Sequence, residues 1–172
     1  MSFSVQSNSS KEIVFLEVEK YLKQNGLHYS SKDEERPWGG FFVIDKTDTE
    51  KFIELYFSNY PIEQIKKYGI ELSPKILIVE PHKRLSWQYH NRRAELWYVI
   101  CGPVGFTRSS DDKQSLVKLL NNNQAVQFDR EIRHRLLGIN NWGIVAEIWQ
   151  HTDMSNLSNE NDIVRIEDDF GR

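Results

Sequence analysis

The hydrophobic positions of the chain follow one spacing before Pro74 and another after it. Between Ser10 and Asn25 the apolar residues recur at helical spacing, and Ser10 is a candidate N-cap. Thr49 to Tyr68 repeats the helical spacing, with a proline inside it and a glycine directly after it. We therefore expect an N-terminal helix and one or two inserted helices. The polar residues Ser30 to Glu35 between them are typical of a linker.

After Pro74 the pattern changes to short runs rich in β-branched and aromatic residues, separated by Pro, Gly, Asn or Asp. We expect about eight strands, at Ile76–Val79, Leu85–His90, Ala94–Cys101, Val104–Arg108, Ser115–Leu120, Gln124–Phe128, His134–Leu137 and Ile144–Trp149. This regular spacing predicts an all-β sandwich or barrel, and a double-sheet jelly roll satisfies it. Several runs are apolar on both faces, so the barrel interior, helices or a second subunit must cover both sides.

Composition and charge limit the classes of function that the protein can have. The 172 residues suffice for one domain with a sizeable core, and 39% of them are hydrophobic, which indicates a globular chain. The net charge of −3 and the absence of a long basic run argue against a nucleic-acid partner. Cys101 is the single cysteine, which fits a reducing compartment. The apolar group Ile13 to Leu16 is cut short by Glu17, so neither a signal peptide nor a membrane span is expected, and we predict a cytoplasmic protein.

The stretch from Gln88 to Glu95 carries nitrogen and oxygen ligands at a spacing that strands can use. Residues i and i+2 of a strand point to the same face, so Gln88 and His90 project together. If the next residues form a bend, Glu95 opens a returning strand, and His134 from a later strand completes the set. Two imidazoles, a carboxylate and an amide oxygen suit Zn²⁺, Mn²⁺, Fe²⁺ or Co²⁺. The same residue types also occur together on solvated strand faces, which is the alternative interpretation.

Four segments together carry a family resemblance: RPWG at 36–39, QYHNRRAELW at 88–97, RHRL at 133–136 and NDIVRIEDDFGR at 161–172. In this order they resemble the cupin domain of type II mannose-6-phosphate isomerases. Such domains often form the C-terminal part of bifunctional mannose-1-phosphate guanylyltransferase/mannose-6-phosphate isomerases. The closing segment is the most specific of the four, because chance rarely gives so many matches in order.

The resemblance implies a double-stranded β-helix, the cupin jelly roll. Residues 1–34 would form an N-terminal helical arm, and residues 35–172 the cupin domain with a helical insertion at about 47–73. It also implies that Gln88, His90, Glu95 and His134 bind a divalent metal, with Zn²⁺ the first candidate and Mn²⁺, Fe²⁺ or Co²⁺ the others. The implied activity is a metal-dependent aldose–ketose isomerisation of a sugar phosphate, foremost mannose 6-phosphate and fructose 6-phosphate.

Three further residues are candidates for the chemistry. Arg93 stands at the arginine of the family motif and would hold the enediolate or the phosphate; a surface ion pair is the alternative. Lys75 matches a basic position of the family and would bind phosphate or move a proton, unless it is a solvated strand end. Glu147 alternates with Trp149 and His151 along one strand and is a candidate general base, although such a glutamate more often accepts a hydrogen bond from a neighbour.

The sequence also departs from the family pattern. Arg92 and Leu96 replace family histidines, and Asp129 and Glu131 replace a proline and a glycine before His134. These changes leave open a second function, a non-catalytic cupin that binds a sugar phosphate or a nucleotide-sugar, and a third, a metal-free scaffold. Because strands that are apolar on both faces need a second cover, we also expect a homodimer.

Overall fold

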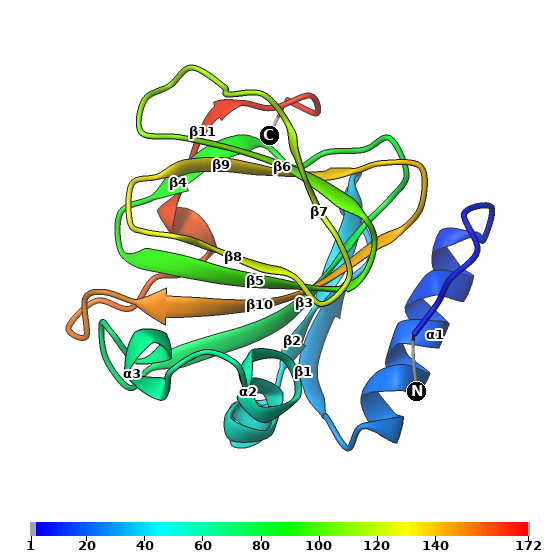
Figure 1. Ribbon diagram of the computed structural model, residues 1–172, viewed down its shortest axis with the longest axis horizontal. Coiled ribbons are helices and arrows are strands. Elements are labelled where there is room, and N and C mark those ends of the chain that lie inside the picture. Colours follow the sequence, from blue (N-terminus) through cyan, green and yellow to red (C-terminus); the bar gives the residue numbers. More distant parts are fainter. Residues whose placement is uncertain (1–2, 172) are drawn as a thin grey trace.

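The computed structural model describes residues 3–171, which fold into two facing antiparallel sheets with helices on one outer side (Figure 1). One sheet has six strands in the order β1-β2-β3-β10-β5-β8, and the other has five in the order β11-β4-β9-β6-β7. Neighbours in each sheet come from distant parts of the chain, as in a jelly roll. The predicted all-β jelly-roll architecture is confirmed.

The six-stranded sheet contains the longest strands: β1 (Tyr29–Asp33), β2 (Gly39–Ile44), β3 (Leu72–Val79), β5 (Arg93–Cys101), β8 (Ala125–Phe128) and β10 (Gly143–His151). The five-stranded sheet is built from β4 (Trp87–His90), β6 (Val104–Ser109), β7 (Lys118–Leu120), β9 (Arg133–Gly138) and β11 (Ile163–Glu167). Strand β10 lies between β3 and β5, and all nine of its residues are buried.

The helices are α1 (Lys11–Gln24), η1 (Lys46–Asp48), α2 (Thr49–Phe57), α3 (Ile62–Ile65) and η2 (Glu160–Asp162). Helix α1 begins where it was predicted, because the Ser10 hydroxyl accepts a hydrogen bond from the Ile13 amide. Its apolar stripe packs on the outer face of the six-stranded sheet, with Phe15 stacked near Phe42. Helices α2 and α3 cover the same face (Figure 1).

Two separate apolar cores follow from this arrangement. The outer one lies between the helices and the six-stranded sheet, and the inner one lies between the two sheets around Trp97, Phe106 and Phe128. The strands that are apolar on both faces are therefore covered by this chain's own helices. A second subunit is therefore not needed to cover these strands. This removes the argument for a homodimer that was based on them, and the homodimer itself stays a prediction.

Three predictions of local structure were wrong. The polar segment Ser30 to Glu35 is not a linker but contains edge strand β1, whose middle residues are exposed. An edge strand is held by backbone hydrogen bonds to one neighbour, so it needs no apolar alternation. Of Ser115 to Leu120, only the last three residues pair as β7. The charged C-terminal segment, where no strand was expected, adds β11 to the edge of the five-stranded sheet.

No helix within residues 3–171 combines the length and apolar character needed to cross a lipid bilayer.

Candidate metal centre and pocket

The predicted metal ligands come from both sheets. Gln88 and His90 lie on β4, and His134 lies on β9, where it is the direct register partner of Gln88. Glu95 lies on β5 of the other sheet, because the chain bends at Asn91 and Arg92 and crosses over. All four side chains are buried. The facing sheets thus bring the side chains together across the interior, as the spacing predicted.

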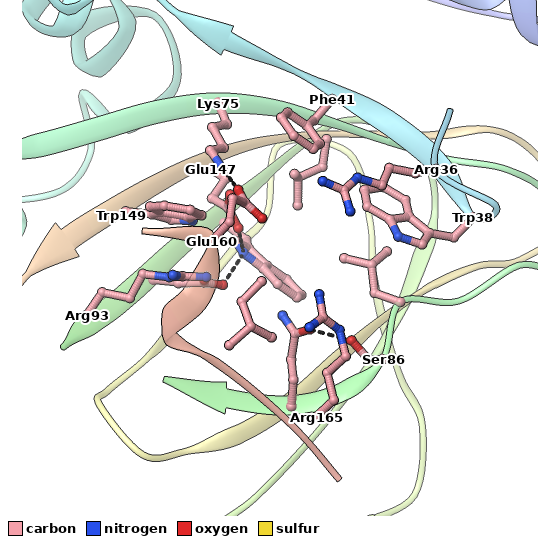
Figure 2. A pocket seen from close by; sticks show the side chains of 16 residues that line it. Arg36, Trp38, Phe41, Lys75, Ser86, Arg93, Glu147, Trp149, Glu160 and Arg165 are labelled. Carbon is pink, nitrogen blue, oxygen red and sulfur yellow. Dashed lines mark hydrogen bonds and ion pairs between the residues drawn. The ribbon is translucent and has the colours of Figure 1, made fainter. Parts of the chain in front are cut away.

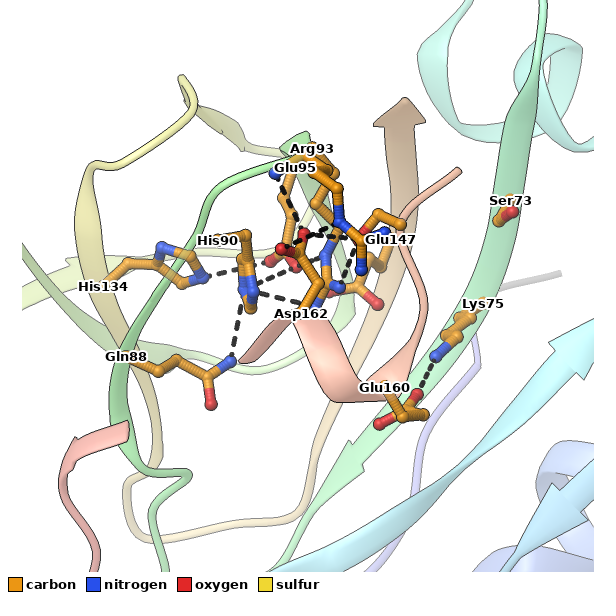
Figure 3. Close-up of polar contacts among 12 residues, drawn as sticks. Ser73, Lys75, Gln88, His90, Arg93, Glu95, His134, Glu147, Glu160 and Asp162 are labelled. Carbon is orange, nitrogen blue, oxygen red and sulfur yellow. Dashed lines mark hydrogen bonds and ion pairs between the residues drawn. The ribbon is translucent and has the colours of Figure 1, made fainter. Parts of the chain in front are cut away.

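The carboxylate of Glu95 lies between the two imidazoles (Figure 3). Glu95 Oε1 is 3.0 Å from His90 Nε2, and Glu95 Oε2 is 3.1 Å from His134 Nε2. One ligand atom from each of these residues lies within 4.8 Å of the others, so together they could hold a metal ion. Within residues 3–171 this is the single group of histidine, cysteine and acidic residues with that geometry.

The hydrogen bonds of His134 match the needs of a metal ligand, whereas the buried Nδ1 of His90 has no hydrogen-bond partner. His134 Nδ1 donates to the Ile132 carbonyl oxygen at 2.9 Å, since a carbonyl oxygen can only accept. In the neutral imidazole, Nε2 therefore carries its lone pair toward Glu95, and this buried atom makes no hydrogen bond. Two acceptors that face each other at 3.1 Å repel unless a cation lies between them. A carbonyl that fixes the tautomer in this way is typical of metal-binding histidines.

The protonation states also suit a metal site. Burial lowers the pKa of His90 to about 4, so its imidazole is neutral near pH 7. Burial alone would raise the pKa of Glu95, but His90, Arg93 and His134 together hold that pKa well below its usual value. Metal ions bind neutral imidazole and ionised carboxylate, so His90 and Glu95 are already in the states that a metal requires.

Gln88 lies beside this cluster but faces it with its amide nitrogen. Gln88 Nε2 is 3.5 Å from His90 Nε2, and its Oε1 accepts from the Ser86 hydroxyl at 2.5 Å. A metal would be bound through the amide oxygen, so the amide group of Gln88 has to flip before it can act as a ligand. The structure therefore brings all four predicted residues together and orients three of them.

The cluster opens into a pocket that the three catalytic candidates also line (Figure 2). Arg93 is 2% exposed, and its guanidinium contacts Glu95 Oε1 (Nε, 2.8 Å) and His90 Nε2 (Nη2, 3.2 Å) and lies 3.6 Å from the ring centre of Trp149. Lys75 Nζ lies 3.5 Å above the same ring and pairs with Glu160 at 2.6 Å. Neither residue is a solvated strand end or a rim ion pair.

Glu147 is a buried carboxyl of this pocket. The Trp97 indole donates to Glu147 Oε1 at 2.9 Å and lies 3.2 Å from Glu95 Oε2, so it bridges the two carboxyl groups. Burial and the neighbouring charge of Glu95 raise the pKa of Glu147 to about 8. His151, on the same strand, is tied instead to Ser73 (2.8 Å) and the Ser158 amide (3.0 Å).

Several residues that line the pocket had no role in the predictions from sequence. They are Arg36, Trp38, Glu160 and Arg165. Asp162 was not considered either. Its carboxylate accepts hydrogen bonds from the amides of Asn91 and Arg92, at the turn between β4 and β5, which carry candidate metal ligands. The closing motif was the available signal, because both Asp162 and Arg165 belong to it.

A jelly roll with a His/Glu/His cluster buried between its sheets defines this protein as a cupin with a candidate metal centre. The chain belongs to the family described as mannose-6-phosphate isomerase C-terminal, whose model matches residues 23–168.

The curated relatives include proteins of alginate and xanthan biosynthesis and a mannose-1-phosphate guanylyltransferase. The chain is 34% identical over 137 residues to alginate biosynthesis protein AlgA of Pseudomonas aeruginosa and 31% identical over 137 residues to xanthan biosynthesis protein XanB of Xanthomonas campestris. It is 28% identical over 157 residues to mannose-1-phosphate guanylyltransferase ManC of Salmonella typhimurium. These matches cover 80%, 80% and 90% of this chain but only 22%, 23% and 26% of the relatives. The chain thus spans about a quarter of their length.

Solved structures agree with the fold. An oxalate decarboxylase from Bacillus subtilis superposes with a TM-score of 0.56 at 12% identity, over 80% of this chain and 31% of that one. Vicilin from hazelnut, Corylus avellana, superposes with a TM-score of 0.52 at 12% identity, over 76% and 34%. At such low identity the likeness concerns the fold alone.

Proposed function

We propose that this protein is a metal-dependent aldose–ketose isomerase of sugar phosphates, and that it interconverts mannose 6-phosphate and fructose 6-phosphate. The observation that carries this proposal is the convergence of His90, Glu95 and His134 within 4.8 Å, beside a pocket that Glu95 and the buried carboxyl of Glu147 both line. The family supports the choice of substrate. We place the protein in the cytoplasm, as its composition predicted.

His90, Glu95 and His134 would hold the divalent ion, and Gln88 would join them after its amide turns. The donor set contains nitrogen and oxygen without sulfur, which favours Zn²⁺ and leaves Mn²⁺, Fe²⁺ and Co²⁺ as alternatives. Such an ion acts as a Lewis acid toward the oxygens of the open-chain sugar and stabilises the negative charge that develops on them.

Glu147 is our candidate for the proton transfer. Isomerisation takes a proton from C2 of the aldose and returns one to C1, so a single carboxyl group can serve as base and then as acid. A pKa near 8 allows both protonation states to be populated close to neutral pH. The Trp97 indole fixes the position of the carboxyl group and keeps it apart from Glu95.

Arg93 and Lys75 add fixed positive charge to this pocket. Arg93 holds Glu95 through Nε and also binds Ser158 Oγ (2.9 Å) and the Asn159 carbonyl (3.2 Å), so its guanidinium cannot swing away. Positive charge held in place stabilises an oxyanion more than mobile charge does, because no reorganisation is required during the reaction. Lys75 is held by Glu160 and by the face of Trp149 in the same way.

A coupled assay for fructose 6-phosphate tests the proposal. Chelation should abolish turnover of mannose 6-phosphate, and one added divalent ion should restore it. Glu147→Gln should retain the metal and lose turnover by about 10²- to 10⁴-fold. Glu63→Gln, a change at an exposed glutamate of α3, is the matched control and should leave turnover unchanged. Absence of turnover in the metal-loaded protein would contradict the proposal.

The second candidate function is a non-catalytic cupin that binds a sugar phosphate or nucleotide-sugar. Its sequence support came from Asp129 and Glu131, which replace family residues before His134. Asp129 instead accepts a hydrogen bond from Tyr68 Oη at 2.7 Å, Glu131 is exposed, and neither lines the pocket. These replacements therefore leave the candidate site intact, which favours the enzyme.

A further inference from the structure

The charges that line the pocket are unequal in number and unevenly placed. Its cations are Arg36, Lys75, Arg93 and Arg165, and its carboxylates are Glu95, Glu147 and Glu160. Figure 2 shows Glu147 and Glu160 on the side of Lys75 and Arg93, and the other two arginines on the opposite side near Trp38 and Ser86. Glu95 belongs to the first side, because it pairs with Arg93 at 2.8 Å. The pocket thus has an acidic and metal-binding side and a side that carries two arginines.

On the metal-binding side, each cation pairs with a carboxylate that also lines the pocket. Arg93 pairs with Glu95 at 2.8 Å, and Lys75 pairs with Glu160 at 2.6 Å. Arg36 differs, because its carboxylate partner at 2.8 Å is Asp33 of β1, which does not line the pocket. Its guanidinium points into the pocket in Figure 2. The arginine side of the pocket therefore holds a guanidinium whose paired carboxylate lies outside the pocket lining.

Arg165 reaches the same place from the other sheet. It lies on β11 as the register partner of Gln88, and directly opposed residues of an antiparallel pair share a face. Because Gln88 faces the interior, Arg165 faces it too, and it lines the pocket together with Arg36. Trp38, Phe41 and Leu85 form apolar walls beside them. Such walls lower the local dielectric and strengthen the attraction for an anion.

We propose that Arg36 and Arg165 bind the phosphate group of a sugar monophosphate. Two planar guanidinium groups, one from the loop between β1 and β2 and one from β11, can each offer paired N–H donors to a phosphate with three terminal oxygens. This assignment rests on the proposed function and deepens it, because it sets the direction of the substrate. The phosphate lies on the arginine side, and the carbonyl end of the open chain lies toward His90, Glu95, His134 and Glu147.

Calorimetric titration of the metal-loaded protein with fructose 6-phosphate and, separately, with fructose tests this inference. Arg36→Gln and Arg165→Gln should each weaken fructose 6-phosphate binding by about 10- to 100-fold, the loss of charged hydrogen bonds to one guanidinium. Binding of fructose should not change between variants and wild type. Arg130→Gln, at an exposed arginine whose ion-pair partner is Glu131, is the matched control and should bind as wild type does.

Lysine variants keep the test valid if a glutamine variant fails to fold. Arg36→Lys and Arg165→Lys keep the charge and lose the planar fork, so their affinity for fructose 6-phosphate should lie between wild type and the glutamine variants. Unchanged affinity in folded Arg36→Gln and Arg165→Gln proteins would overturn the inference. Because calorimetry detects binding whether or not the protein converts the ligand, an inactive protein that loses phosphate affinity in these variants would refute the isomerase proposal and keep the phosphate site. If nucleotide-sugar binds more tightly than fructose 6-phosphate, the monophosphate assignment is overturned.

Discussion

The Asp162 carboxylate binds both the backbone amide and the guanidinium group of Arg92. Asp162 Oδ2 accepts from the Arg92 amide at 3.0 Å, and Oδ1 accepts from its guanidinium Nε at 3.3 Å. Arg92 lies in the turn that carries the chain from His90 in one sheet to Glu95 in the other. The C-terminal segment therefore holds the turn on which the geometry of the candidate metal centre depends.

This relationship predicts the effect of Asp162→Asn. The new amide nitrogen would face backbone donors, so we expect a loss of about 1–3 kcal/mol in the free energy of unfolding. Metal affinity should fall by roughly 10- to 100-fold, as for other residues that position metal ligands. Urea denaturation and metal competition titration measure the two effects. Asp111→Asn, at an exposed loop residue, is the control, and equal metal affinity in both variants would refute the positioning role.

Removal of one imidazole should abolish metal binding. We expect His134→Ala to lose the bound divalent ion, because its Nε2 is one of the three ligand atoms that converge. Elemental analysis of the purified protein should give about one ion per wild-type chain and none per variant chain. His82→Asn replaces an exposed histidine in a turn with positive φ, which Asn tolerates, and should keep the metal. A His134→Ala protein with full metal content would exclude this site.

The raised pKa of Glu147 predicts a pH dependence of stability in metal-free protein. Between the ordinary glutamate pKa of 4.5 and the folded-state pKa of about 8, the folded state keeps a proton that the unfolded chain has released. The free energy of unfolding should therefore fall as pH rises through this window, and the full stabilisation is present only below it. Urea denaturation at pH 5 and pH 8 should show a drop of roughly 2–5 kcal/mol from this group. Glu147→Gln should flatten that slope, and an identical slope in both proteins would contradict the raised pKa.

The homodimer is a separate prediction. The helices already cover the outer face of the six-stranded sheet, so an interface should lie elsewhere. Edge strand β7 and the residues before it expose Leu116 and Leu119 to 88% and 57%. We expect light scattering at micromolar concentration to give a dimer, and Leu119→Lys to shift it toward monomer. A wild-type monomer under these conditions would contradict the prediction.

The strands and the cluster of candidate ligands could be predicted because their signals are local. Period-two runs between turn residues mark the strands, and the spacing from Gln88 to Glu95 places three candidate ligands on two strands that follow each other in the chain. The contribution of Asp162 and the pairing of Lys75 with Glu160 join segments far apart in sequence, and spacing carries no information on such contacts. Edge strands β1 and β11 lack apolar alternation, so only their backbone pairing reveals them. The division at residue 34 into a helical arm and a cupin domain stays a prediction.

The central claim is that this pocket moves a proton between C1 and C2 of a sugar phosphate with the help of a bound divalent ion. Its most direct test is proton NMR of mannose 6-phosphate in D₂O with the metal-loaded protein. We predict that fructose 6-phosphate forms with deuterium at C1 and that mannose 6-phosphate exchanges its C2 proton, because a side-chain carboxyl exchanges with solvent between the two transfers. An unchanged C2 proton and no product, with about one metal ion bound per chain, would contradict the account.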